Sequence, residues 1–168
     1  MKSASYWIEH LELQAHPEGG HYREVYRSAE QLTQGLDPRF SGPRSICTSI
    51  YFLLEHGEFS ALHRICSDEL WHFHDGTGLD IHVIDAQDTY RGLKLGPNFD
   101  TGERYQHVVE HGALFGASVG QPGGYALVGC TVAPGFDFAD FEMPSQGTLL
   151  KRYPQHETLI RALSRNEV

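Results

Sequence analysis

Short β-type segments separated by glycines recur along most of the chain, and this feature most constrains the fold. The stretches "SICTSIYFLL", "LDIHVID", "ALFGASV" and "YALVGCTVA" are rich in β-branched and aromatic residues. Such residues favour strands, and short strands that recur about every 8–12 residues are typical of an antiparallel sandwich or barrel. The middle of the chain therefore predicts an all-β fold.

Helical patterns flank these strands. Near the start, Ser3 or Ser5 can cap a short helix, which "HPEGG" at residues 16–20 then breaks. The stretch "SQGTLLKRYPQHETLIRALSR" predicts two short helices, with Pro154 at the first turn of the second. The sequence shows no repeat and no interdomain linker, so residues 1–168 are expected to form a single domain.

The composition limits the kinds of molecule that the protein is expected to bind. Acidic residues number 22 against 13 basic ones, and the formal net charge is −9, which argues against nucleic acid and anionic membranes as partners. No apolar run approaches the roughly 20 residues of a membrane span. Glu9 and Glu12 fall where a signal peptide would need an apolar core. The three cysteines form no C-x-x-C motif, so we expect a cytoplasmic protein.

The stretch "HGEFSALHRICSDELWHFHDGTG", residues 56–78, concentrates histidines and acidic residues. It places His63 six residues after Gly57, Glu69 six residues after His63, and Gly76 seven residues after Glu69. In every spacing it resembles the first signature of the cupin superfamily, with Ile65 where the second histidine of the signature would stand. Downstream, "EHGALFGASV" resembles the second signature more weakly, with Phe115 in place of its histidine.

The wider pattern is more specific than these signatures. It comprises "HPEGGHYRE", "SIYFLL", "DELWHFHDG", "VAPGFDFADFE" and "YPQH". From about Ile8 to His156 the chain resembles one uncharacterised cupin family among the RmlC-like jelly rolls. The resemblance implies a cupin-type double-stranded β-helix, a jelly-roll barrel with a short N-terminal helix and C-terminal helices. It also implies a homodimer, and it brings no established reaction.

The metal site of the cupins is expected to be lost. Metal-binding cupins hold a divalent ion with three histidines and one glutamate, of which His63 and Glu69 remain here, with Ile65 and Phe115 in the other two positions. Two protein ligands seldom hold a metal firmly. We therefore expect neither a metal nor another cofactor.

Strand alternation decides which neighbours share the cavity with Glu69. If Glu69 points inward, Trp71 and Phe73 point inward as well, whereas His72 and His74 point outward. A β-bulge that reversed this order would let His72 or His74 rebuild a metal site.

These positions predict an aromatic-walled cavity with one histidine and one carboxyl group, suited to a small organic ligand. The candidate catalytic residues are His63, as a general base, and Glu69, which would orient its ring. Tyr51 or Tyr22 could serve as the acid, and Arg23 or Arg27 could bind an anion at the rim. The candidate ligand-binding residues are Tyr51, Trp71, Phe73, Phe115 and Arg23.

Three functions remain open. The first is a metal-independent isomerase or epimerase acting on a sugar or nucleotide-sugar-like metabolite, as the resemblance to the RmlC-like epimerases suggests. The second is a module that binds a metabolite without converting it. The third is a metal-dependent cupin enzyme with a degraded or rebuilt site. The polar loop at residues 37–45 is expected to be a surface loop that joins two strands, and the alternative is that it covers the mouth of a pocket.

Overall fold

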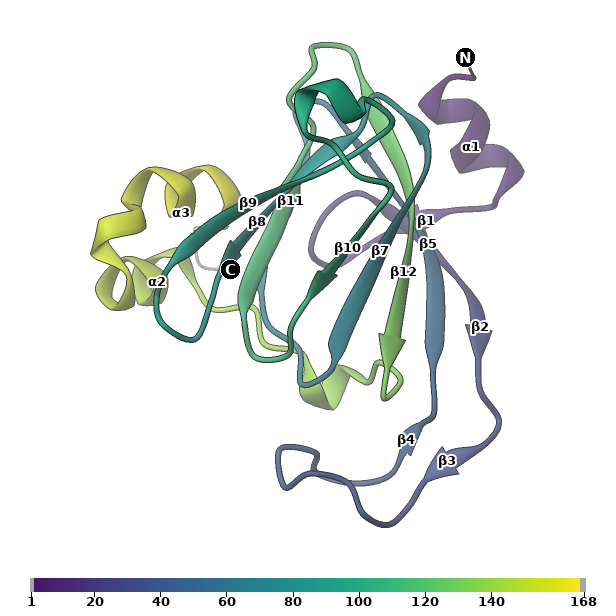
Figure 1. Cartoon of the computed structure of the whole chain (residues 1–168), viewed down its shortest axis with the longest axis vertical. Helices are drawn as coiled ribbons and strands as arrows, with labels where there is room; N and C mark the ends of the chain where they lie inside the picture. Colours follow the sequence, from purple (N-terminus) through teal and green to yellow (C-terminus); the bar gives the residue numbers. More distant parts are fainter. Residues whose placement is uncertain (1, 167–168) are drawn as a thin grey trace.

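Two antiparallel sheets face each other and enclose the core. The computed structural model describes residues 2–166. One sheet has six strands in the order β1-β2-β5-β12-β7-β10, and the other has four in the order β6-β11-β8-β9 (Figure 1). The strands of the first sheet are β1 (Gln14–Ala15), β2 (His21–Arg27), β5 (Thr48–Glu55), β7 (Asp68–Gly76), β10 (Gln106–Val109) and β12 (Tyr125–Ala133). Those of the second are β6 (Phe59–His63), β8 (Leu79–Ile84), β9 (Tyr90–Leu95) and β11 (Leu114–Ser118).

Alternation along the strands builds the core between the sheets. On β5, Phe52 and Leu54 point inward and join the core cluster, whereas Leu53 between them packs on the outer face. Val83 of β8 and Phe115 of β11 meet the inward residues of β5 from the opposite sheet. The predicted all-β jelly-roll fold is therefore confirmed.

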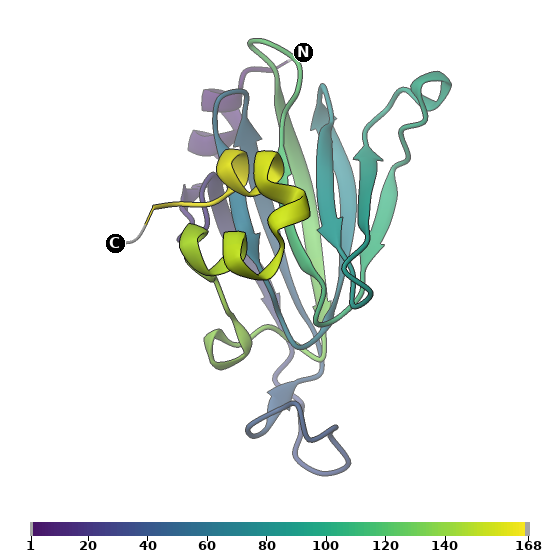
Figure 2. The same cartoon turned by 90° about the vertical axis from the view of Figure 1, so that its left-hand side faces the viewer.

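Helices cover the outer faces of both sheets. Helix α1 (Ala4–His10) begins after Ser3, whose hydroxyl accepts the Tyr6 N–H, and it packs on the six-stranded sheet. Helices α2 (Gln146–Arg152) and α3 (Glu157–Leu163) cover the four-stranded sheet (Figure 2). Between them lies the 3₁₀ turn η3 (Pro154–His156), and two further 3₁₀ turns are η1 (Phe99–Thr101) and η2 (Phe138–Asp140). The predicted flanking helices are thus confirmed, and within residues 2–166 no helix is long and apolar enough to cross a membrane.

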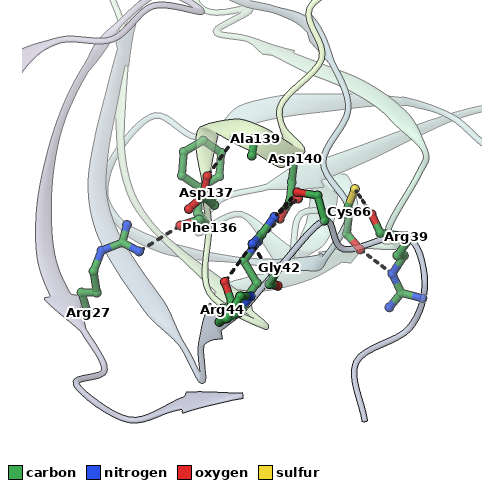
Figure 3. A network of polar contacts seen from close by, with 11 residues as sticks. Arg27, Arg39, Gly42, Arg44, Cys66, Phe136, Asp137, Ala139 and Asp140 are labelled. Atoms are coloured by element: carbon green, nitrogen blue, oxygen red, sulfur yellow. Dashed lines mark hydrogen bonds and ion pairs between the residues drawn. The ribbon is translucent and has the colours of Figure 1, made fainter. Parts of the chain in front are cut away.

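A two-stranded arm projects beyond the sandwich between β2 and β5 (Figure 1). Its strands are β3 (Gln31–Leu32) and β4 (Arg44–Ser45), so the loop expected at residues 37–45 does join two strands. The Arg44 guanidinium donates from Nε and Nη2 to both carboxylate oxygens of Asp140, at 2.7 and 2.6 Å (Figure 3). Each of these side chains is 5% exposed, so a buried, bidentate ion pair ties the arm to η2.

We expect Asp140→Ala to lower the free energy of unfolding by about 3–5 kcal/mol, because it leaves the Arg44 charge buried without a partner. Urea unfolding followed by circular dichroism measures this loss. The matched control is Glu157→Gln, which removes an exposed ion pair with Arg161 and should change stability by less than about 1 kcal/mol. Equal losses in the two variants would contradict a structural role for the buried pair.

Candidate functional site

A pocket of about 450 Å³ opens where strand ends of the two sheets meet. We call it the barrel-end pocket. Its walls come from the ends of β2, β5, β6, β7 and β12, from the loop before β2 and from the segment after β12. The lining residues are Gln14, His16, Glu18, Tyr22, Glu24, Arg27, Thr48, Ile50, His63, Ile65, Glu69, Cys130, Val132, Phe136, Asp137 and Phe138.

The "HPEGG" loop brings two of these side chains into the pocket. The Glu18 carbonyl accepts the N–H of Ala61 at 2.8 Å, so the loop lies directly against β6. Gly19 has a φ of +116°, and a Cβ there would come within 2.1 Å of the Phe59 carbonyl oxygen. Only glycine tolerates both this conformation and this approach. The glycine thus fixes His16 and Glu18 at the floor of the pocket.

His63 and Glu18 form a buried pair on that floor. His63 is 3% exposed and Glu18 is 7% exposed. The Nδ1 atom of His63 lies 2.7 Å from the Ala61 carbonyl oxygen, which can only accept, so Nδ1 carries a proton. The Nε2 atom lies 3.1 Å from Oε2 of Glu18, so a protonated ring would form an ion pair with this carboxylate. The pair therefore places an imidazole ring and a carboxyl group side by side at the floor of the pocket.

Two further groups complete the surroundings of Glu18. The Ser60 hydroxyl donates to the other carboxylate oxygen of Glu18 at 3.0 Å. The Glu18 N–H donates to Nδ1 of His16 at 3.2 Å, which leaves that nitrogen as an acceptor. Burial lowers the pKa of His16, an effect that the Glu18 carboxylate opposes and His63 reinforces. His16 is therefore an uncharged ring at neutral pH.

Glu69 stands at the start of β7 and has a different environment. It is 8% exposed, and burial followed by the nearby Glu18 carboxylate raises its pKa to about 8. A hydrogen bond with the Cys130 thiol offsets part of this rise. Burial and Glu69 in turn raise the pKa of the Cys130 thiol. At neutral pH Glu69 is thus mainly a neutral carboxylic acid, which can donate a proton.

Charged and aromatic groups form the rim. Arg27 donates from Nε and Nη2 to both oxygens of Glu24, at 3.0 and 2.7 Å, and from Nη1 to the Phe136 carbonyl at 3.0 Å. Figure 3 shows Arg27 reaching across to this segment. Phe138 is 58% exposed beside the pocket, and the carboxylate of Asp137 accepts the Ala139 N–H. The rim therefore presents aromatic faces and carboxylates, with its arginine already engaged.

The structure brings the two expected catalytic residues, His63 and Glu69, into the barrel-end pocket together with Ile65. It gives His63 a different partner, however. Both ring nitrogens of His63 are engaged, by Ala61 and Glu18, so Glu18 orients the ring in the place expected for Glu69.

Two expected ligand-binding residues, Tyr51 and Arg23, lie on the outer face. Tyr51 packs in the cluster under α1, and its ring centroid lies 5.8 Å from that of His74. Arg23 pairs with Glu12 and donates to the Leu11 carbonyl. The expectation is corrected because each residue alternates with inward neighbours on its strand, so its side chain must point away from the pocket.

The other three, Trp71, Phe73 and Phe115, belong to the core rather than to the pocket wall. Trp71 and Phe115 are each 1% exposed, and Phe73 packs against the same cluster. The inward direction predicted for Trp71 and Phe73 is right, but interlocked side chains from the two sheets fill that part of the interior. Phe115 acts through another residue: its ring centroid lies 4.2 Å from that of His63, which it supports.

The structure also tests what the sequence predicts for the outward histidines of β7 and for the loop at residues 37–45. His74 lies beside Tyr51 on the outer face, and His72 lines a shallow surface hollow next to it, so the alternation predicted along β7 is confirmed. No residue of the loop at 37–45 lines the pocket, which agrees with a plain surface loop and not with the alternative of a cover over the mouth. The ion pair with Asp140 directs that loop toward η2 instead.

Sequence reasoning missed His16, Glu18 and the segment at residues 136–138. The turn signal of "HPEGG" was visible, but its contact with β6 was not. The only available hint was the placement of a histidine and a glutamate beside a glycine pair, since glycines often allow a close backbone approach. The pattern "VAPGFDFADFE" carries no signal that its phenylalanines Phe136 and Phe138 line the pocket.

The donor set does not fit the divalent metal of the cupin superfamily. Ile65 and Phe115 offer no donor atom, and the Nε2 atom of His63 lies 3.1 Å from the Glu18 carboxyl group. Within residues 2–166, no three histidine, cysteine or acidic side chains are grouped as metal ligands would be. The chemistry of this pocket is therefore derived from its own acids and bases.

The raised pKa of Glu69 predicts a pH-dependent stability. The folded state holds this proton up to about pH 8, whereas the unfolded chain releases it near the ordinary value of 4.5. Between these limits the folded state binds more protons, so stability should fall as the pH rises from about 5 to 8.

Glu69→Gln should flatten this part of the curve and make the protein more stable than the wild type at pH 8, by on the order of a few kcal/mol at most. Urea unfolding at several pH values tests this. Glu110→Gln, at an exposed position, is the control and should keep the wild-type slope. A Glu69→Gln curve parallel to that of the wild type would contradict the buried neutral carboxyl group.

Comparison with known proteins places the chain in a family. A solved structure of a hypothetical protein from Leishmania major is 42% identical, with a TM-score of 0.89 over 99% of this chain and 100% of the other. A protein from Shewanella oneidensis is 45% identical, with a TM-score of 0.89 over 99% of this chain and 100% of its own. A cupin 2 domain-containing protein from Halorhodospira halophila shares the fold at 14% identity, with a TM-score of 0.58 over 92% of this chain and 89% of the other.

No curated protein matches the chain. The family model described as "Cupin superfamily (DUF985)" matches residues 5–144, which is most of the sequence. That region contains the whole barrel-end pocket, from Gln14 to Phe138. The chain therefore belongs to the DUF985 family of the cupin superfamily.

Proposed function

We propose that the barrel-end pocket binds a small organic ligand and moves protons on it without a metal, as an isomerase or epimerase does. One observation carries the proposal: the pocket holds two buried carboxyl groups in different states. Glu18 accepts a hydrogen bond from Ser60 and lies 3.1 Å from Nε2 of His63, whereas burial raises the pKa of Glu69 to about 8. Titratable groups whose environments separate their proton affinities supply an acid and a base within one site.

The proposed reaction assigns a role to each group. The Glu18 carboxylate removes a proton from a ligand carbon next to a carbonyl group, and the C–H electrons form the carbon–carbon double bond of an enediol. Glu69 donates its proton to the carbonyl oxygen as charge develops there. Return of a proton to the other face, or to the neighbouring carbon, completes an epimerisation or an isomerisation and restores both carboxyl groups. His63 is a positioning residue for Glu18.

Exchange of ligand hydrogen with solvent tests this role directly. The protein is incubated in D₂O with a panel of aldoses and ketoses, and deuterium next to the carbonyl is followed by NMR. We expect incorporation into at least one sugar, and a loss of about 100-fold or more in Glu18→Gln, since a positioned base contributes that much. Glu157→Gln, in α3 and outside the pocket lining, should keep the wild-type rate.

A different result would favour the second function. If a sugar perturbs the ring signals of His16 and His63 but exchanges no hydrogen, the pocket binds a metabolite without converting it. If exchange persists in Glu18→Gln, the proposed base is wrong.

We also propose a homodimer. Beyond Tyr22, strand β2 has a neighbour on one side only, because β1 pairs with just His21 and Tyr22. Val25 and Tyr26 on this part of the strand are 50% and 54% exposed. A free edge with exposed apolar side chains favours association. The strand "SIYFLL" lies inside the sheet as β5 and cannot contribute a free edge.

Light scattering at micromolar concentration should give twice the mass of one chain. Tyr26→Lys should shift the protein toward the monomer, because it places a charge on the free edge. Tyr90→Lys, at a residue 43% exposed on the other sheet, is the control. A wild-type protein with the mass of a single chain would contradict the dimer.

A cytoplasmic location is proposed as well. Cys47, Cys66 and Cys130 are all free thiols. Disulfides are the usual feature of proteins in oxidising compartments, so free thiols support a reducing one. Expression with a fluorescent fusion and cell fractionation would test the location.

A further inference from the structure

The charges that line the barrel-end pocket restrict the ligand it can take. Four carboxyl groups line it, those of Glu18, Glu24, Glu69 and Asp137, against one arginine and two histidines. From this distribution we propose that the ligand carries hydroxyl or amine groups and no phosphate or carboxylate. This rests on the proposed function for the ligand's place in the pocket, but not for its conversion.

The deep part of the pocket has no free positive charge. His63 faces the Glu18 carboxylate at 3.1 Å, so any charge on its ring is already balanced. The second ring, that of His16, stays neutral because burial lowers its pKa. An anionic group placed here would meet the Glu18 carboxylate without a counter-ion, and burying an unpaired charge is costly.

Arg27 is the remaining cation, and three of its five N–H donors are in use. Nε and Nη2 bind both oxygens of Glu24, and Nη1 binds the Phe136 carbonyl. A phosphate on the two other N–H groups would lie beside the Glu24 carboxylate, which already balances the charge of Arg27. Asp137, which is close enough to raise the pKa of Arg27, adds a further negative charge at the rim. The rim therefore repels anions although it contains an arginine.

The same groups suit donors on a ligand. The Glu24 and Asp137 carboxylates accept hydrogen bonds from hydroxyl or ammonium groups, and the exposed ring of Phe138 offers a face for C–H groups or a cation. Deep in the pocket, Glu69 is more than nine-tenths buried, and the neighbouring Cys130 thiol lowers its pKa only in part. Its O–H remains available for an uncharged oxygen atom of the ligand. The pocket thus recognises neutral oxygen at its floor and donors at its rim.

Three probes of similar shape and different charge test the proposal: glucosamine, glucose and glucose 6-phosphate. Binding is followed by the NMR signals of the His16 and His63 rings, which report on this pocket. We expect glucosamine and glucose to shift these signals with saturation, and glucose 6-phosphate to bind at least about tenfold more weakly than glucose.

Two variants separate the role of the rim from a general effect of charge. Glu24→Gln releases Arg27 and removes a carboxylate, so the affinity for glucose 6-phosphate should rise by about tenfold or more. Glu12→Gln makes the same chemical change at the partner of Arg23, outside the pocket, and should leave all three affinities unchanged.

The proposal is overturned if glucose 6-phosphate binds the wild type as tightly as glucose. It is overturned equally if neither glucose nor glucosamine shifts the ring signals. These results are independent of hydrogen exchange: a charge preference without exchange refutes the proposed catalysis alone, and exchange on a phosphorylated sugar refutes the ligand class alone.

Discussion

The close approach of the loop at residues 16–20 to the backbone of β6 is the contact on which the pocket depends. It requires a residue without a Cβ at Gly19, because any larger residue would collide with the Phe59 carbonyl. The hydrogen bond from Ala61 to the Glu18 carbonyl then fixes the direction of the Glu18 side chain, and this places its carboxylate against His63. A backbone constraint at one glycine thus determines where a charge is buried inside the sandwich.

Local hydrogen bonding explains why two glutamates in one cavity behave differently. Glu18 accepts a hydrogen bond from the Ser60 hydroxyl, and the His63 ring lies 3.1 Å from its other oxygen. Burial raises the pKa of Glu69, the nearby Glu18 carboxylate raises it further, and the Cys130 thiol offsets only part of the rise. The two groups interact, because the nearby Glu18 carboxylate is one cause of the raised pKa of Glu69.

The strand patterns in the sequence predict most of the fold and part of the site. Alternation with a period of two correctly placed Glu69 and Trp71 inward and His74 outward, because no bulge separates Glu69 from Trp71 along β7. Alternation could not tell whether an inward side chain lines a pocket or fills the core, since that depends on the side chains of the facing sheet. It also could not place residues outside strands, so Glu18, which a turn brings to the floor of the pocket, had no signal of its own.

Replacement of the cupin ligands changes what the barrel end can hold. Phe115 sets its ring against His63, and Glu18 lies 3.1 Å from Nε2 of His63, so the ring faces an aromatic side chain and a carboxyl group. An imidazole ring beside a carboxyl group supplies far less positive charge to a ligand than a divalent ion does. The proposed chemistry therefore relies on ligands that acidify their own C–H bonds, as carbonyl compounds do, and on a neutral acid such as Glu69 to protonate the developing oxyanion. A divalent cation beside Glu69 would work against this chemistry, because it would favour the ionised form of Glu69 and remove the proton that the acid has to give.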